Sequence, residues 1–274
     1  MGMFLSVMDC MFEDQGHMRS PGVTVRCHGA LNDFLPRAQR GQPVTLPWSA
    51  HESVKHLVEV AGVPHPEIAA LTVNGVPVGF NVRVAPGAVI DVYPHEDTPP
   101  EPGTQAGASL LPLPASRLTP GSARLRFACD VHLGRLAAYL RMLGFDTLYR
   151  NDQSDAELVA IASTEERVLL TRDVRLLMRS AVTYGAFVRT TTPEAQLREV
   201  ARRYNLRASA QPFRRCIRCN GLTTPVAKAE ILDQLLPKTR RYYDEFWRCQ
   251  TCGQIYWRGS HVQRMQALID RALA

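Results

Sequence analysis

The chain of 274 residues contains no apolar segment approaching the ~20 residues that a membrane-spanning helix requires. Residues 1–20 also lack the basic start and apolar core of a secretory signal peptide. These absences predict a protein without a membrane partner, and we expect a cytoplasmic location. Residues 1–22 have no periodic pattern and are expected to form a disordered extension.

Cysteine is scarce, and its placement argues against a disulfide framework. Seven cysteines occur, and four of them form two Cys-x-x-Cys pairs, Cys216 with Cys219 and Cys249 with Cys252. This number and spacing suit a reducing compartment and a tetrahedral Zn²⁺ site with four thiolate ligands. Because four thiolates leave no open coordination position, we expect the zinc to be structural. A hairpin or helix must lie between the pairs, and residues 224–236 have a helical pattern.

Basic residues are in short supply in the first part of the chain. Residues 1–100 carry 6 Lys and Arg against 10 Asp and Glu, whereas residues 101–274 carry 26 against 16. A strongly basic region attracts polyanions, because neutralised phosphates release counterions. The second part is therefore where a polyanion such as a nucleic acid would bind. The alternative is charge that serves solubility alone.

Residues 23–97 have the pattern of a small β-grasp domain with a ubiquitin-like fold. An alternating strand opens the unit, and a helical stretch runs from about Ser53 to Ala61. Asn74-Gly75 predicts a type I′ hairpin, and a further strand follows it. The order of strand, helix, hairpin and strand is the basis for this assignment.

The proline-rich residues 98–122 are expected to form an extended linker between this unit and the next. Residues 123–208 then alternate strands with helices, which predicts an α/β fold with a parallel sheet flanked by helices. Residues 209–274 contain the paired cysteines and a final amphipathic stretch. They are expected to form a zinc ribbon and a terminal helix.

Two of the predicted strands end on an aspartate, Asp130 and Asp173, and Asp155 opens the helix between them. The carboxyl ends of parallel strands meet at one edge of the sheet, where ligands bind. Carboxylates gathered there are suitable ligands for Mg²⁺ or Mn²⁺, which catalyse phosphoryl transfer. The alternative is that each aspartate caps a helix. Arg172 is a candidate for stabilising transition-state charge, or for pairing with a carboxylate.

Aromatic side chains alternate with arginines around the paired cysteines. The aromatic residues are Phe213, Tyr242, Tyr243, Phe246, Trp247, Tyr256 and Trp257. In single-strand binders, aromatics stack on bases and arginines hold phosphates, so the ribbon is expected to assist RNA binding. Tyr243 and Trp257 are the stacking candidates. The alternative is that a small ribbon uses these aromatics as its own core.

Three segments closely resemble the Mut-seven carboxy-terminal RNase domain family of the PIN-like nuclease superfamily: Phe127-x-x-Asp130-x-x-Leu133-Gly134, Leu140-Arg141-x-Leu143-Gly144-Phe145-Asp146-Thr147 and Leu169-Leu170-Thr171-Arg172-Asp173. The family's zinc-ribbon tail is similar to Cys216-x-x-Cys219-Asn220 and Cys249-x-x-Cys252-Gly253-x-x-Tyr256-Trp257. Residues 23–97, with Leu31-Asn32-Asp33-Phe34 and Val73-Asn74-Gly75, resemble the ubiquitin-like domain often fused in front, which has the ThiS/MoaD sulfur-carrier fold.

The resemblance implies a metal-dependent PIN-like ribonuclease in which Asp130, Asp155 and Asp173 match the acidic residues of the family. Typical PIN nucleases carry a further acid on a helix between the first two, and this chain offers only Asp146, in a predicted strand. A catalytically weak or inactive RNA-binding adaptor is therefore the alternative function. The ubiquitin-like unit continues into a linker and lacks a free Gly-Gly tail, so we expect docking with a protein partner, not sulfur carriage.

Overall fold

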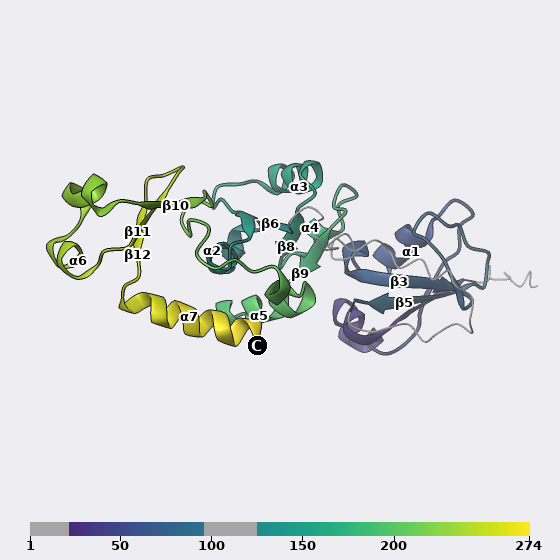
Figure 1. Ribbon diagram of the computed structural model, residues 1–274. Helices are drawn as coiled ribbons and strands as arrows, with labels where there is room; N and C mark the ends of the chain where they lie inside the picture. Colours follow the sequence, from purple (N-terminus) through teal and green to yellow (C-terminus); the bar gives the residue numbers. More distant parts are fainter. Residues whose placement is uncertain (1–21, 96–124) are drawn as a thin grey trace, which may run out of the picture.

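The computed structural model describes residues 22–95 and 125–274. The expected linker (98–122) and all but the last residue of the expected extension (1–22) lie outside the described residues. Three parts lie in a row, with the β-grasp part at one end, the parallel sheet in the middle and the cysteine ribbon at the other end (Figure 1). No helix in these described ranges is long and apolar enough to cross a membrane.

The N-terminal part is a five-stranded sheet with the order β2-β1-β5-β3-β4, in which β1 and β5 are parallel and the other neighbours antiparallel. Its elements are β1 (Val23–Cys27), β2 (Val44–Leu46), α1 (Val54–Val60), β3 (Ile68–Val73), β4 (Val76–Pro77) and β5 (Val89–Pro94). Ser53 caps α1 by accepting a hydrogen bond from the backbone of His56. Asn74 and Gly75 both have positive φ, as the predicted hairpin requires, and the ubiquitin-like fold is confirmed.

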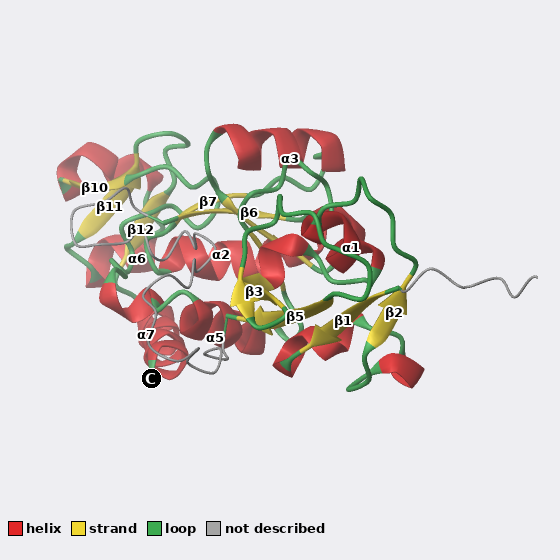
Figure 2. Cartoon of the chain, turned by 90° about the vertical axis from the view of Figure 1, so that its right-hand side faces the viewer, coloured by secondary structure: helices red, strands yellow, loops and turns green. Residues whose placement is uncertain are grey.

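The central part is a four-stranded parallel sheet with the order β7-β6-β8-β9, as the alternation of strands and helices predicts. Its elements are β6 (Arg126–Cys129), α2 (Gly134–Met142), β7 (Asp146–Leu148), α3 (Asp155–Thr164), β8 (Val168–Thr171), α4 (Val174–Leu177), β9 (Gly185–Phe187) and α5 (Pro193–Arg203). Helices cover both faces, with α3 on one side and α2 and α5 on the other (Figure 1, Figure 2).

The alternation of side chains along the strands explains the two covered faces. Phe127 and Cys129 of β6 pack in the core with α2 and α5, whereas Ala128 between them packs with α3. Leu169 of β8 also packs with α3, while both of its neighbours join the larger core. Because successive residues point to opposite faces, a sheet covered on both sides needs the continuous apolar runs found in β6 and β8.

The C-terminal part is a three-stranded antiparallel ribbon followed by a helix that packs beside α5. Its elements are β10 (Thr223–Val226), α6 (Pro237–Tyr242), β11 (Phe246–Cys249), β12 (Ile255–Trp257) and α7 (Ser260–Leu273). The helical pattern of residues 224–236 is wrong at its start, because these first residues pair with β11 as strand β10. A 3₁₀ helix (Lys228–Gln234) follows instead.

The β-grasp part docks on β9, the edge strand of the central sheet. Glu67 is 2% exposed at this interface, and its carboxylate lies 2.9 Å from Arg203 Nη1 and 3.2 Å from Arg189 Nη2. The backbone N–H of Phe187 in β9 donates to Glu67 Oε1 at 2.7 Å. Phe34 packs edge-on against Phe187, with 5.5 Å between the ring centroids. A buried ion pair and an aromatic contact therefore hold the two parts together.

Candidate active site and zinc centre

The strand order of the central sheet creates a position for a ligand between β6 and β8. The chain passes from β6 to β7 on one side and then crosses back to β8 on the other side, so the direction of winding reverses between β6 and β8. In open α/β sheets, ligands bind outside the carboxyl ends of the strands at this switch point. Asp130 directly follows β6, and Asp173 lies two residues beyond the end of β8. Both residues therefore flank the switch point.

Thr171, the last residue of β8, links the two aspartates. Its hydroxyl donates to Asp130 Oδ2 at 2.6 Å and accepts from the backbone N–H of Asp173 at 2.9 Å. Asp130 is 5% exposed, whereas Asp173 is exposed. Asp130 Oδ1 also accepts from the backbone of His132 at 3.3 Å, and Asp173 Oδ1 from that of Arg175 at 2.8 Å. Each aspartate thus caps the following turn and also belongs to one network that joins the two strand ends.

Asp155 lies in the first turn of α3, outside this network. Its side chain is 57% exposed, and its partner Arg179 is 3.9 Å away. The cap of α3 is formed by Ser154 with Glu157, so Asp155 is not the capping residue. Within residues 22–95 and 125–274, only the four cysteines form a group of three or more closely spaced metal-binding side chains. The structure joins Asp130 to Asp173 and does not gather all three aspartates.

Arg172 contacts backbone carbonyl groups. Its Nη1 lies 3.0 Å from the carbonyl oxygens of Val188 and Arg189 and 2.5 Å from that of Thr190. These contacts hold the segment that connects β9 to α5. In this arrangement Arg172 positions the chain next to the switch point and donates to carbonyls in place of a carboxylate or a phosphate.

Asp146 is the first residue of β7, so it lies at the amino ends of the parallel strands, whereas Asp130 lies at their carboxyl ends. Asp146 pairs in register with Arg126 at the beginning of β6, and the two strands are parallel. Arg167 is 2.7 Å away, and Asn220 donates to Asp146 at 2.8 Å. Burial raises the pKa of Asp146, but the hydrogen bonds from Arg167 and Asn220 outweigh it and hold the pKa below its usual range. Asp146 is therefore a structural residue and does not supply a further acid at the switch point.

Gln153 is a buried polar residue that no sequence pattern singles out. It lies in the connection from β7 to α3 and is 8% exposed, and neither atom of its amide group has a hydrogen-bond partner in the described structure. An unpaired buried polar group costs about 1–3 kcal/mol, so such a group calls for a water or a ligand. This connection leaves the carboxyl end of β7, the edge that also carries Asp130. Gln153 is therefore a candidate substrate-positioning residue.

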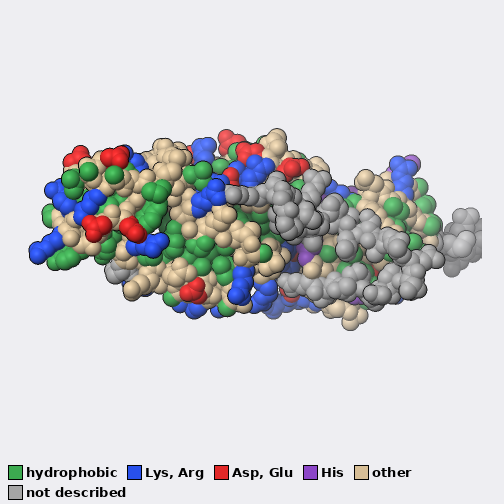
Figure 3. Space-filling model, viewed as in Figure 1, with side chains coloured by type: hydrophobic (Ala, Val, Ile, Leu, Met, Phe, Trp, Pro, Cys, Tyr) green, Lys and Arg blue, Asp and Glu red, His purple; other side chains and the backbone are tan. Residues whose placement is uncertain are grey.

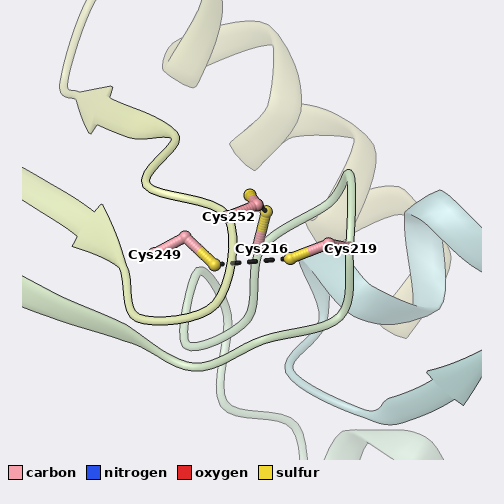
Figure 4. A group of neighbouring side chains, drawn as sticks. All are labelled: Cys216, Cys219, Cys249 and Cys252. Atoms are coloured by element: carbon pink, nitrogen blue, oxygen red, sulfur yellow. Dashed lines mark hydrogen bonds between the residues drawn. The ribbon is translucent and has the colours of Figure 1, made fainter.

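The two cysteine pairs meet as predicted (Figure 4). The four Sγ atoms lie within 4.8 Å of one another, with 3.7 Å between Cys216 and Cys252 and 3.4 Å between Cys219 and Cys249. A tetrahedral site with Zn–S bonds of about 2.3 Å has sulfur atoms roughly 3.8 Å apart. The chemistry and spacing of these donors fit Zn²⁺, and four protein ligands would leave a bound zinc no open coordination position.

Neighbouring groups favour the thiolate form at one of these cysteines. The hydroxyl of Tyr256 lies 3.0 Å from Cys216 Sγ. Burial raises the pKa of the Cys216 thiol, but hydrogen bonds from Tyr256 and from the backbone outweigh it and lower the pKa to about 7. Burial raises the pKa of Cys219 to about 12. Metal binding would release this proton, because the ligand must be a thiolate.

The first cysteine pair is anchored on the central sheet. Arg141 of α2 is 5% exposed and donates to the carbonyl oxygens of Ile217 and Arg218, which lie between the two cysteines, at 3.2 and 3.0 Å. Asn220 Oδ1 accepts from the backbone N–H of Thr147 in β7 at 3.0 Å. These contacts fix the ribbon against the domain that carries Asp130 and Asp173.

Two family models match the chain, one over the β-grasp part and one over the parts that follow it. The Mut7-C RNAse domain family matches residues 125–269, more than half of the chain, and the Mut7-C ubiquitin family matches residues 20–99. The solution structure of Urm1 from Trypanosoma brucei is similar over 27% of this chain and 92% of that chain, with 15% sequence identity and a TM-score of 0.22. No curated protein matches. By its nuclease-like domain, together with the ubiquitin-like domain in front of it, the chain belongs to the Mut7-C RNase domain family.

Proposed function

We propose that the protein is a metal-dependent ribonuclease that hydrolyses RNA phosphodiester bonds, and that Asp130, Asp155 and Asp173 hold Mg²⁺ or Mn²⁺. The observation that carries this proposal is the hydrogen-bonded link from Asp130 through Thr171 to Asp173 at the switch point of an RNase-family domain. The donor set fits the ion, because both metals prefer carboxylate oxygens. Asp155 fits less well, since it stands outside the network.

The ion would activate water and neutralise charge on the phosphodiester. The chain's own residues prepare the position. The Thr171 hydroxyl fixes the orientation of the Asp130 carboxylate, as partners of ligating carboxylates commonly do. The unpaired amide of Gln153 is suited to hydrogen-bond the RNA or a bound water. Arg172 donates to carbonyl oxygens of the segment after β9 and is a positioning residue in this proposal. To stabilise transition-state charge, it would have to exchange these carbonyl partners for a phosphate.

The test is cleavage of labelled single-stranded RNA by the zinc-loaded full chain, with and without Mn²⁺. Asp130→Asn and Asp173→Asn each remove a carboxylate but keep a side chain that caps helices as well as aspartate does. We expect each to lower the cleavage rate on the order of 100-fold or more, with unchanged circular dichroism. The matched control is Asp152→Asn, an exposed aspartate of the neighbouring loop that pairs with Arg150.

If both variants cleave at the rate of the wild-type chain, the metal-site assignment is wrong. If both variants lose activity, Asp155→Asn separates two arrangements of the site. A loss as large as that of Asp130→Asn means that the metal draws Asp155 into the site, whereas no loss means that Asp130 and Asp173 act without it.

The second candidate function is an RNA-binding adaptor with little or no activity. It is favoured by the separation of Asp155 from the other two aspartates and by the location of Asp146 at the opposite edge. In this case the wild-type chain would bind RNA through its basic part but would not cleave it at any concentration of Mg²⁺ or Mn²⁺. The zinc ribbon would assist RNA binding under both proposals, and the docked β-grasp part remains a candidate contact for a protein partner.

A further inference from the structure

The aromatic side chains of the ribbon divide between the two faces of its sheet. Trp247 of β11 pairs in register with Pro225 of β10 and with Tyr256 of β12, so these three side chains share one face. Phe246 belongs to the opposite face. That face forms the small core of the ribbon, together with Val226, Ile231, Leu235, Tyr243, Ile255 and Trp257. The face of Trp247 is therefore not needed for the core of the ribbon.

This second face lines a cavity of about 300 Å³ between the ribbon and the beginning of α7. Trp247 and Tyr256 line it from the ribbon, Met265 from α7, and Phe213 from the segment before the first cysteine pair. The volume is at the lower end of the range for small-molecule pockets and suits one flat aromatic group. Figure 3 shows apolar side chains at this end of the molecule, with both basic and acidic side chains among them.

Arginines accompany the aromatic side chains at the cavity. Arg214, Arg215 and Arg258 are part of its lining, and the described lining contains no acidic residue. The guanidinium of Arg258 lies 5.4 Å from the ring centroid of Trp247, and its side chain is 73% exposed. Its carboxylate partner, Glu245, is 3.9 Å away and also exposed, so this pair is weak. Arg258 is therefore available to an anion next to the cavity.

Two walls of the cavity are held in place by specific contacts. Phe213 has a φ of 63°, a left-handed conformation that bulky residues rarely adopt, and its N–H donates to the carbonyl of Met142 at 2.8 Å. Strained backbone of this kind concentrates at functional sites. The hydroxyl of Tyr256 lies 3.0 Å from Cys216 Sγ, which ties this wall to the zinc centre.

We propose that this cavity binds one unstacked base of single-stranded RNA, with Trp247 as the stacking surface and Arg258 as the contact to an adjacent phosphate. The inference rests on the proposed ribonuclease function and states how that enzyme holds its substrate. Aromatic side chains stack on any base, so the mostly apolar cavity selects unpaired bases without selecting a sequence. A base-paired nucleotide would have to leave its duplex to enter.

The test measures binding of a short labelled single-stranded RNA to the zinc-loaded full chain carrying Asp130→Asn, which we expect to suppress cleavage, in the absence of Mg²⁺ and Mn²⁺. We expect Trp247→Ala to raise Kd roughly 10- to 100-fold and Trp247→Phe to restore most of the affinity. The matched control is Tyr242→Ala. Tyr242 is 66% exposed and has Arg241 at 5.5 Å from its ring centroid, the same pairing as Trp247 with Arg258 but outside the cavity. This control should keep its affinity.

Arg258→Gln tests the phosphate contact, and because the side chain is 73% exposed we expect the variant to fold like the wild-type chain. The slope of log affinity against log salt concentration should be shallower than in the wild-type chain by about 0.7, the value for one phosphate of a single strand. A duplex of the same sequence should bind without any dependence on Trp247. The zinc content of each variant shows whether the ribbon is intact.

Equal single-strand affinities of the Trp247→Ala and Tyr242→Ala variants, together with an unchanged salt slope in Arg258→Gln, would overturn the pocket. That result leaves the ribonuclease proposal standing if the chain with Asp130 restored cleaves RNA. In the converse case, RNA binding depends on Trp247 but the wild-type chain does not cleave RNA. That result supports the base-binding cavity and contradicts the ribonuclease function. The two proposals can therefore fail separately.

Discussion

Substitution of Glu67 by Gln should separate the β-grasp part from the central sheet. Glu67 is 2% exposed, and in the described structure it is the only carboxylate within ion-pair distance of Arg203, whose side chain is 11% exposed. The glutamine keeps the shape of the side chain and can still accept from Phe187 N–H through its oxygen. The change removes the charge and replaces the second oxygen, which accepts from Arg189 and Arg203, with an NH2 donor. Breaking a buried ion pair costs about 3–5 kcal/mol, because the remaining charge stays without a partner.

Hydrogen exchange at the amide of Phe187 measures this cost directly, because that N–H donates to Glu67 across the interface. At 1.4 kcal/mol for each factor of ten, a loss of about 3 kcal/mol lowers protection roughly 100-fold. The control is Asp244→Asn, since Lys228 and Asp244 are 2.8 Å apart but the aspartate is 88% exposed. A surface pair of this kind contributes about 0–1 kcal/mol, so protection at Phe187 should not change.

The pH dependence of the same signal provides a second test. Burial raises the pKa of Glu67, but Arg203 and Arg189 outweigh it and hold the pKa below its usual range. The contribution of Glu67 is therefore complete above its unfolded-state pKa of about 4.3 and is lost as the pH falls through the lower pKa of the folded state. Protection corrected for intrinsic exchange should fall there in the wild-type chain and not in Glu67→Gln. Equal protection in Glu67→Gln and Asp244→Asn at neutral pH would refute this reasoning.

Two further predictions concern the zinc centre and the junction with the ribbon. Elemental analysis should find one zinc ion per chain. The Cys249→Ser variant should lose this zinc, and protease should then cleave within residues 213–257 while the central sheet stays resistant, because zinc binding stabilises the fold of the ribbon. Gly144→Ala should lower the free energy of unfolding by more than ~1 kcal/mol in urea, because Gly144 has a φ of +92° and an added Cβ would clash with the Gln211 carbonyl. Gly79→Ala, which meets no atom within 4 Å, should change it by less than about 0.5 kcal/mol.

The elements that sequence patterns predict well are those that depend on local periodicity. The apolar runs that end at Asp130 and Asp173 predict two buried parallel strands, and the rule for open α/β sheets then places both residues at one edge. The cysteine spacing predicts the zinc centre for a similar reason, since each pair forms its own turn. In these cases short-range sequence determines the geometry.

Features that depend on distant partners were not accessible from the sequence. Residues 224–236 have a helical pattern, but pairing with β11 makes Thr223–Val226 a strand, and Pro225 is tolerated there because β10 is an edge. The link from Thr171 to Asp130 is a hydrogen bond between residues 41 positions apart. Gln153 carries no signal at all, since only its burial without a partner makes it notable. The separation of Asp155 from Asp130 likewise depends on how α3 is placed over the sheet.

The two flanking parts of the chain have the same structural role at opposite edges of the central sheet. At β7, the backbone N–H of Thr147 donates to Asn220 Oδ1 of the ribbon, and at β9 the N–H of Phe187 donates to Glu67 Oε1 of the β-grasp part. Open edge strands attract other strands, and proteins cover them to prevent aggregation. A fragment that begins after the linker would therefore expose the β9 edge and leave Arg203 without its carboxylate. The domain that carries the candidate active site is closed at both edges only when all three parts are present.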